Sequence, residues 1–225
     1  MKKYISYIVL ILCIPTLIII GNSVFKNKQY SFISIGIAII ACIAFFLSFE
    51  SRQHSTESLI LVSVMTALSV AGRFLFAFAP GFKPVTSIVI ITALYFGSEA
   101  GFMAGALSAL ISNIYFGQGP WTPFQMFAWG IVGLLAGILA PMLKKSRISL
   151  LIYGAFSGIL FSMIMDIWTA LWQDNSFNIM RYAAAVISSA KFTVIYALSN
   201  VIFLFVLAGP IGKKLERAKA KYGLK

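Results

Sequence analysis

The sequence has little charge and few of the side chains that metal sites and acid–base catalysis use. Of its 225 residues, 6 are Asp or Glu, 1 is His and 2 are Cys. Cys13 and Cys42 both lie in apolar runs, so neither a disulfide framework nor a metal site follows. The only histidine, His54, lies in a polar link and receives no role. We therefore predict no metal and no cofactor.

The local signatures of nucleotide-hydrolysing and hydrolytic enzymes are also missing. There is no GxxxxGK segment, which excludes ATP hydrolysis through that phosphate loop. There is no HExxH and no GxSxG, and Asp166 has no second acid inside the apolar runs to act with it. We predict a protein that is not an enzyme and assign no catalytic residue. An intramembrane enzyme that depends on Asp166 stays open as an alternative.

Long apolar runs dominate the chain. It is 60% hydrophobic with a mean hydropathy of +0.93, which indicates an integral membrane protein. A single span over 85–116 would be about 48 Å long, well over a hydrocarbon core of about 30 Å, and Gly97 to Gly101 reads as a tight turn. We therefore divide this stretch and expect eight spans, at about 4–20, 32–49, 59–78, 85–96, 101–116, 124–142, 149–171 and 183–208.

The basic residues set the expected topology. The net charge is +12, and most Lys and Arg lie in short segments between or after apolar runs, which points to orientation in the membrane rather than to nucleic acid. With eight spans, the lysines at the N-terminus, Arg52, Lys144 to Arg147 and the tail from Lys213 fall on one side. We place both termini in the cytoplasm of a multi-pass cell-membrane protein. Residues 1–20 could instead be a signal peptide, but no cleavage site follows cleanly.

The domain organisation follows from these runs. We expect an N-terminal transmembrane hairpin and cytoplasmic link (1–58), a six-helix core (59–209) and a basic cytoplasmic tail (210–225). Three pairs of glycines four residues apart predict close helix packing in the core; they are Gly101/Gly105, Gly133/Gly137 and Gly154/Gly158. No internal repeat is strong enough to suggest the inverted repeats of secondary transporters.

Three charged residues fall inside the apolar runs: Arg73, Asp166 and Lys191. Charges within a membrane are costly and usually functional. They could bind a ligand near the outer side, or Asp166 could form an internal ion pair with Arg73 or Lys191. An ion pair would not exclude a ligand site nearby.

Aromatic and amide side chains gather at the outer ends of the expected spans. Residues 113–129 mix aromatics, amides and turn residues, and all four tryptophans lie on this side (Trp121, Trp129, Trp168 and Trp172). An aromatic belt is one interpretation, but belts form at both interfaces. We expect a pocket for a large, partly apolar molecule that forms hydrogen bonds. No rows of charge continue through the inner half, so such a pocket needs a partner for transport.

The stretch 67–84 combines a docking face with a charge and a loop. Ala67 and Ala71 are four residues apart and share one helix face, which lets another helix approach closely in lipid. Arg73 follows within the apolar run, and Pro80-Gly81 and Pro84 then end the helix. We assign Ala67 and Ala71 to partner docking.

Residues 59–209 resemble the substrate-binding membrane subunit, or S-component, of energy-coupling factor (ECF) vitamin transporters. Ala67-xxx-Ala71 matches the small-residue motif with which that family's first core helix meets the transmembrane coupling subunit. Four stretches look most like the cobalamin-specific branch: Ala71-Gly-Arg73, Pro80-Gly-Phe-Lys-Pro84, Phe116-Gly-Gln-Gly-Pro-Trp-Thr-Pro123 and Gln125-Met-Phe-Ala-Trp129. The hairpin at 4–49 departs from the six-span core of the family.

The resemblance implies a subunit that binds its substrate outside the cell, beneath the loop 79–84. A coupling subunit and two cytoplasmic ATPases then drive toppling of the subunit and release inside. The substrate it implies is cobalamin or a related corrinoid, with riboflavin, a queuosine precursor or another micronutrient as alternatives. A stand-alone channel or secondary carrier is a further alternative. The substrate-binding residues expected from the outer pocket and the resemblance are Arg73, Phe82, Lys83, Asn113, Gln118, Trp121, Gln125, Trp129, Asp166, Trp168 and Lys191.

Overall fold

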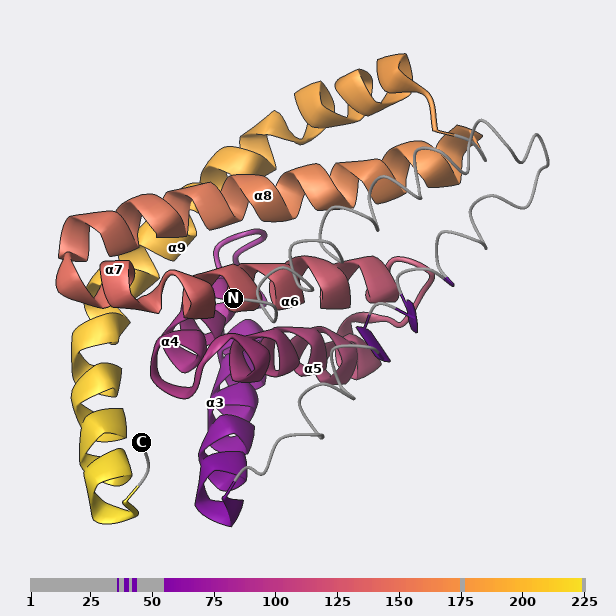
Figure 1. Ribbon diagram of the computed structural model, residues 1–225. Coiled ribbons are helices and arrows are strands. Elements are labelled where there is room, and N and C mark those ends of the chain that lie inside the picture. Colours follow the sequence, from indigo (N-terminus) through magenta and orange to yellow (C-terminus); the bar gives the residue numbers. More distant parts are fainter. Residues whose placement is uncertain (1–35, 37–38, 41, 44–54, 175–176, 224–225) are drawn as a thin grey trace, which may run out of the picture.

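Helices make up the chain wherever secondary structure is described. The computed structural model describes residues 36, 39–40, 42–43, 55–174 and 177–223. Most of the predicted N-terminal hairpin, 4–49, lies outside these residues. The helices, labelled in Figure 1, are α3 (Thr56–Leu75), α4 (Val85–Phe96), α5 (Ser98–Phe116), α6 (Thr122–Ile138), α7 (Ala140–Lys145), α8 (Arg147–Asp174) and α9 (Ile179–Lys221).

In the residues that are described, the structure confirms the predicted all-helical fold, which is consistent with a membrane protein. By length and composition, α3, α8 and α9 are each long and apolar enough to span a membrane. The helix α4 has 12 residues and rises about 18 Å, which is shorter than a hydrocarbon core. The six later predicted spans correspond to α3, α4, α5, α6, α8 and α9. The first two fall almost entirely outside the described residues, so a count of eight stays a prediction.

The boundaries of the helices follow local sequence signals. The helix α3 starts after Ser55, whose hydroxyl accepts a hydrogen bond from Ser58 N at 3.2 Å. Gly97, with φ of 92°, separates α4 from α5, so the predicted division of the stretch 85–116 is confirmed. The predicted run 124–142 is interrupted instead, because α6 ends at Ile138 and α7 begins two residues later, with Pro141 in its first turn.

The helix α9 is longer than the predicted span. It covers 43 residues and continues through Pro210, so the expected boundary between 209 and 210 lies inside a helix. Proline provides no N–H for the helix ladder and its ring bends the helix. Figure 1 shows the last part of α9, in yellow, running steeply away from the direction of α8.

Glycines at the helix contacts allow close packing, as their spacing predicts. A Cβ atom on Gly101 would lie 2.6 Å from the carbonyl oxygen of Gly133, and one on Gly105 would overlap the backbone of α6. In α8, a Cβ atom on Gly158 would lie 2.6 Å from the backbone nitrogen of Ala197 in α9. The pairs α5–α6 and α8–α9 therefore approach each other almost backbone to backbone.

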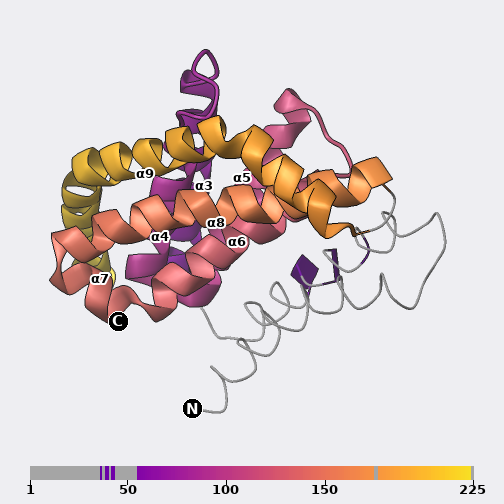
Figure 2. The ribbon, with the colours of Figure 1, turned by 90° about the horizontal axis from the view of Figure 1, so that it is seen from above.

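The helix α4 forms the centre of the bundle. Its residues from Val85 to Leu94 are all buried, so it has no polar face, as expected for a helix surrounded by others. It contacts α3, α5, α6 and α9. Seen from above in Figure 2, α8 and α9 lie over the other helices. The start of α4 thus opens into space enclosed by several helices, and the candidate site lies there.

Candidate functional site

A cavity of about 190 Å³ lies where the loop after α3 meets four helices. The loop contributes Gly81 and Lys83, and α3 contributes Arg73. The remaining lining residues come from α4, α6, α8 and α9; they are Val85, Thr86, Gln125, Trp129, Gly158, Phe161, Met165, Tyr196 and Asn200.

Arg73 is the central cation of this site. It lies near the end of α3 and is 8% exposed. Its Nη1 donates hydrogen bonds to Ser112 Oγ and, at 2.8 Å, to Asn113 Oδ1. The guanidinium carbon lies 4.6 Å from the ring centre of Phe116 and 5.1 Å from that of Trp129. The side chain is held by α5 and by two aromatic faces, so its position is fixed before a ligand binds.

Asn113 connects Arg73 to α6 through hydrogen bonds. Its Nδ2 donates to Thr122 Oγ1 at 3.0 Å and to Gln125 Oε1 at 2.8 Å. Thr122 in turn donates to Gln118 Oε1 at 3.0 Å. The hydrogen bond from Asn113 to Oε1 fixes the side chain of Gln125, which lines the cavity.

Two hydrogen bonds connect the loop 76–84 to α9 on the other side of the cavity. Lys83 N donates to Ser199 Oγ at 2.9 Å, and Ser199 Oγ donates back to Lys83 O at 3.1 Å. Gly81 has a φ of 79°, and a Cβ atom there would lie 3.0 Å from Ile195 Cγ2, so glycine suits both the turn and the close approach. The Lys83 ammonium lies 4.7 Å from the ring centre of Phe116. Burial, and then the charge of Arg73, lower the pKa of Lys83.

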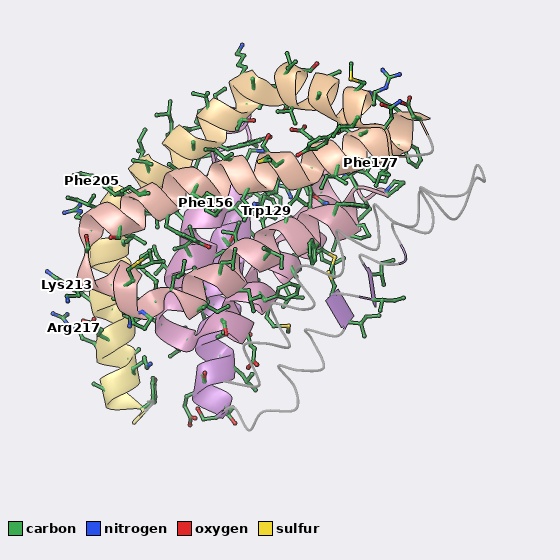
Figure 3. All side chains as sticks on the ribbon, turned by 45° about the horizontal axis from the view of Figure 1, so that its top comes forward. Trp129, Phe156, Phe177, Phe205, Lys213 and Arg217 are labelled. Atoms are coloured by element: carbon green, nitrogen blue, oxygen red, sulfur yellow. The ribbon has the colours of Figure 1, made fainter. Side chains whose placement is uncertain are left out.

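Aromatic rings form one wall of the cavity. Trp129 stacks on Phe161 with ring centres 5.1 Å apart and planes 18° apart, and Tyr196 meets Phe161 edge-on at 5.4 Å. Figure 3 shows Trp129 inside the bundle, between α6 and α8. Asn200 is held by α8, since its Nδ2 donates at 3.2 Å to both Gly154 O and Ser157 Oγ.

Five of the predicted substrate-binding residues come together in this site. Arg73, Lys83, Gln125 and Trp129 line the cavity, and Asn113 connects two of them. None of the five comes from the half of the chain after α6. Arg73 was predicted as a charge within an apolar run, and Asn113, Gln125 and Trp129 as part of the cluster 113–129, while Lys83 came from the family resemblance; these residues do meet in space.

Four others lie outside the cavity lining. Phe82 packs against Phe203 with ring centres 4.9 Å apart, and Gln118 is exposed. Trp121 is 38% exposed and lies over Gly119. Trp168 is buried in a core cluster, 5.3 Å from the ring of Phe124. Their assignment to substrate stays a prediction.

Asp166 and Lys191 also lie apart from the cavity. Asp166 in α8 accepts a hydrogen bond from Ser189 Oγ at 2.7 Å. It borders a separate crevice of about 450 Å³ between α8 and α9, together with Arg181. Lys191 is exposed. Neither Arg73 nor Lys191 is in ion-pair contact with Asp166 in the part of the chain that is described.

Sequence reasoning missed the lining residues contributed by α8 and α9. Tyr196 and Asn200 are four residues apart in an apolar run, so a polar pair on one helix face could have indicated them. Phe161 and Met165 are also four apart, but in a run where most residues are apolar, and their spacing carries no comparable signal. Thr86, the second residue of α4, also lines the cavity and was not predicted.

A second feature, which we call the α3 groove, lies on the outside of α3. It has a volume of about 560 Å³ between α3 and α5, and its lining is almost entirely apolar. Ala67 and Ala71 both line it and both are exposed. Phe74 and Leu107 border it further along. The small side chains leave the backbone of α3 accessible along this groove.

The arrangement of the cavity suits binding rather than chemistry. It combines two cations, amide groups and stacked aromatic rings, and none of its lining residues forms a nucleophile–base pair. Among the described residues, no group of three or more His, Cys, Asp and Glu could hold a metal ion.

A family model described as "ECF-type riboflavin transporter, S component" matches residues 53–217. The chain belongs to this S-component family. It is therefore a substrate-specific, non-catalytic subunit of an ECF transporter, of the kind that works with a coupling subunit and ATPases. A UPF0397 protein of Clostridium perfringens (strain SM101 / Type A) is 25% identical over 181 residues, which cover 77% of this chain and 96% of that protein. No solved structure matches.

Proposed function

We propose that this S-component binds a planar heteroaromatic micronutrient of the riboflavin kind in the cavity beneath the loop 76–84. The observation that carries the proposal is the convergence of fixed cations and amides on a stacked aromatic wall. Trp129 and Phe161 line the cavity with aromatic surface for a ring system, and Arg73, Gln125 and Asn200 provide polar groups for its edges. The family description, which names riboflavin, supports the same class of ligand.

The size of the cavity favours such a ligand over a corrinoid. Pockets for drug-sized ligands have volumes of about 300 to 1,000 Å³. The cavity, at about 190 Å³, lies below this range. A single flat ring system needs only a modest movement of the loop 76–84 to fit, whereas a corrin macrocycle with its nucleotide tail would require the helices themselves to separate.

Identification of the molecule that copurifies with the protein tests this proposal. We expect mass spectrometry of the extracted ligand to give a flavin or a related planar heterocycle. With ligand-free protein, we expect riboflavin fluorescence to be quenched at a stoichiometry of one, and cobalamin not to displace it. A copurified corrinoid, or unchanged riboflavin emission, would refute the assignment.

We further propose that the α3 groove receives a helix of the coupling subunit. An apolar face with small residues permits close contact between helices, and it leaves no unsatisfied polar group when it faces lipid. The same proposal places both termini in the cytoplasm, supported by the basic residues of α7 and of the end of α9. A reporter fused after Lys225 should then be active only as a cytoplasmic fusion.

A further inference from the structure

A larger and chemically different groove lies at the opposite end of α6 from the substrate cavity. It has a volume of about 710 Å³ and is formed where α7, the start of α8 and the last part of α9 meet near the end of α4. We call it the basic groove. Three cations line it, Lys144, Arg147 and Lys213, together with a single carboxylate, Glu216.

Arg147 is held in place with most of its donors unused. Its Nη2 donates to Phe205 O at 2.8 Å, and its guanidinium carbon lies 4.1 Å from the centre of the Phe205 ring. A guanidinium has five N–H donors, so four are left for another partner. Figure 3 shows Phe205 and Lys213 along the same edge of the molecule, where α9 turns.

In the described part of the chain, one carboxylate faces three cations in this groove, so the groove keeps a positive charge. The Lys144 ammonium lies 4.2 Å from the ring centre of Tyr95. Glu216 faces Tyr95 as well, with its Oε1 3.5 Å from the phenol oxygen. Among the described residues, no carboxylate is in ion-pair contact with Lys144, Arg147 or Lys213. An anion in the groove would be attracted by all three cations.

The remaining lining is apolar and continues to the outer surface of the helices. Leu150, Leu204 and Val206 line the groove, and Val206 is 56% exposed. Next to them, Phe205 and Ile148 are 55% and 71% exposed. Large exposed apolar side chains on a membrane protein face lipid tails. The groove therefore has a cationic end and an apolar side that continues into the lipid-facing surface.

We propose that the basic groove binds one anionic phospholipid. Its phosphate lies among Lys144, Arg147 and Lys213, and an acyl chain runs along the exposed Phe205 and Val206. A neutral lipid would leave the cations uncompensated, and a soluble anion would leave the apolar side uncovered. Basic pockets between transmembrane helices bind anionic headgroups for these reasons. This proposal is independent of the vitamin that the substrate cavity binds.

The site has a structural consequence. The phosphate would link α7, α8 and the last part of α9 across the bend at Pro210. Anionic lipid should therefore stabilise the folded protein, because a ligand that binds only the native state raises its stability.

Two double variants with the same loss of charge test the proposal. K144Q/K213Q removes two lysines that line the groove, and K145Q/K214Q removes their exposed neighbours, which do not. The purified proteins are mixed with equal amounts of phosphatidylglycerol and phosphatidylcholine in detergent, and the lipids retained are counted by native mass spectrometry. We expect the wild type to prefer one phosphatidylglycerol. K144Q/K213Q should lower this preference roughly tenfold or more, and K145Q/K214Q should leave it unchanged.

Several results would overturn the proposal. An equal loss of phosphatidylglycerol preference in both double variants would indicate non-specific attraction to positive charge. A wild type that does not prefer phosphatidylglycerol over phosphatidylcholine would show that the groove is not a lipid site. Displacement of phosphatidylglycerol by millimolar inorganic phosphate would identify a site for a soluble anion instead. A second measurement needs no substitution: phosphatidylglycerol added to phosphatidylcholine nanodiscs should raise the unfolding temperature of the wild type. An unchanged unfolding temperature would count against the site.

Discussion

The two faces of α3 differ in polarity and in exposure. One face is polar and buried: Ser69 accepts a hydrogen bond from Ser108 Oγ at 2.9 Å, and Arg73 donates to Asn113. The other face carries Ala67 and Ala71, both exposed in the apolar α3 groove. A single helix of 20 residues thus borders the proposed substrate cavity on one side and the proposed docking surface on the other.

This difference explains how one helix can serve two sites without a conflict between them. Polar groups within lipid must be satisfied inside the protein, and the buried face does this through α5. A surface that docks reversibly must be stable in lipid as well as in the complex, which suits small apolar residues. Gly72 lies between the two faces, and a Cβ atom there would lie 2.5 Å from Pro84 Cγ, so α3 also fixes the end of the loop that covers the cavity.

The largest effect that we expect comes from filling the α3 groove. Ala71→Trp places a large side chain where the partner helix must approach, while lipid accommodates the same bulk. ATP-driven uptake in proteoliposomes with the coupling subunit and ATPases should fall to near background. Substrate affinity of the isolated subunit should stay the same, because the groove and the cavity lie on different faces of α3.

Leu68→Trp is the matched control, since Leu68 is 43% exposed on α3 but does not line the groove. It should leave uptake near the wild-type value. Equal loss of uptake in both variants, or loss of affinity in Ala71→Trp, would contradict the docking assignment.

On the polar face, Arg73→Leu should weaken substrate binding by about a hundredfold. The substitution removes the cation that would form charged hydrogen bonds with the substrate, which are worth roughly 1.5 to 3 kcal/mol. Affinity is measured by fluorescence titration, and thermal unfolding confirms that the variant is folded. Lys191→Leu removes an exposed cation outside the cavity and should leave affinity unchanged. Unchanged affinity in Arg73→Leu together with reduced affinity in Lys191→Leu would contradict a binding site next to α3.

The aromatic wall gives a smaller contrast between two tryptophans. Trp129→Ala should weaken binding by about 1 to 3 kcal/mol, because Trp129 lines the cavity and stacks on Phe161. Trp121→Ala should weaken binding less, because Trp121 is partly exposed and outside the lining. Isothermal titration of both variants tests this difference. A larger loss with Trp121→Ala would indicate that the substrate extends to the outer loop.

Much of the fold could be predicted from the sequence because bilayer thickness limits helix length. The stretch 85–116 is too long for one span, and Gly97 marks its division. The internal hydrogen bonds of Arg73 were also predictable, since a cation in an apolar run requires an internal partner. The break between α6 and α7 was less visible, because the residues around Pro141 are as apolar as their neighbours.

The pairing of side chains across helices could not be predicted. Asp166 meets Ser189 rather than Arg73 because the register of α8 against α9 is set by close contacts such as that of Gly158 with Ala197. Hydropathy locates a span along the chain but does not specify its rotation or its neighbours. For the same reason, Tyr196 and Asn200 became visible as site residues only in three dimensions.

The smallest effect that we expect is a dependence of substrate affinity on pH. We expect it at the substrate cavity but not at the α3 groove. The pKa of Lys83 is lowered by burial and by Arg73, so its ammonium loses its proton at a lower pH than an ordinary lysine. The protonated ammonium is the form that attracts polar substrate atoms, so affinity should fall modestly as pH rises from about 7 to about 9. Lys83→Gln should remove this slope, and titration of the substrate itself is common to both proteins. The α3 groove has no titratable side chain in its lining, so complex formation with the coupling subunit should not follow the same curve. An identical pH slope in Lys83→Gln would exclude Lys83 from the site.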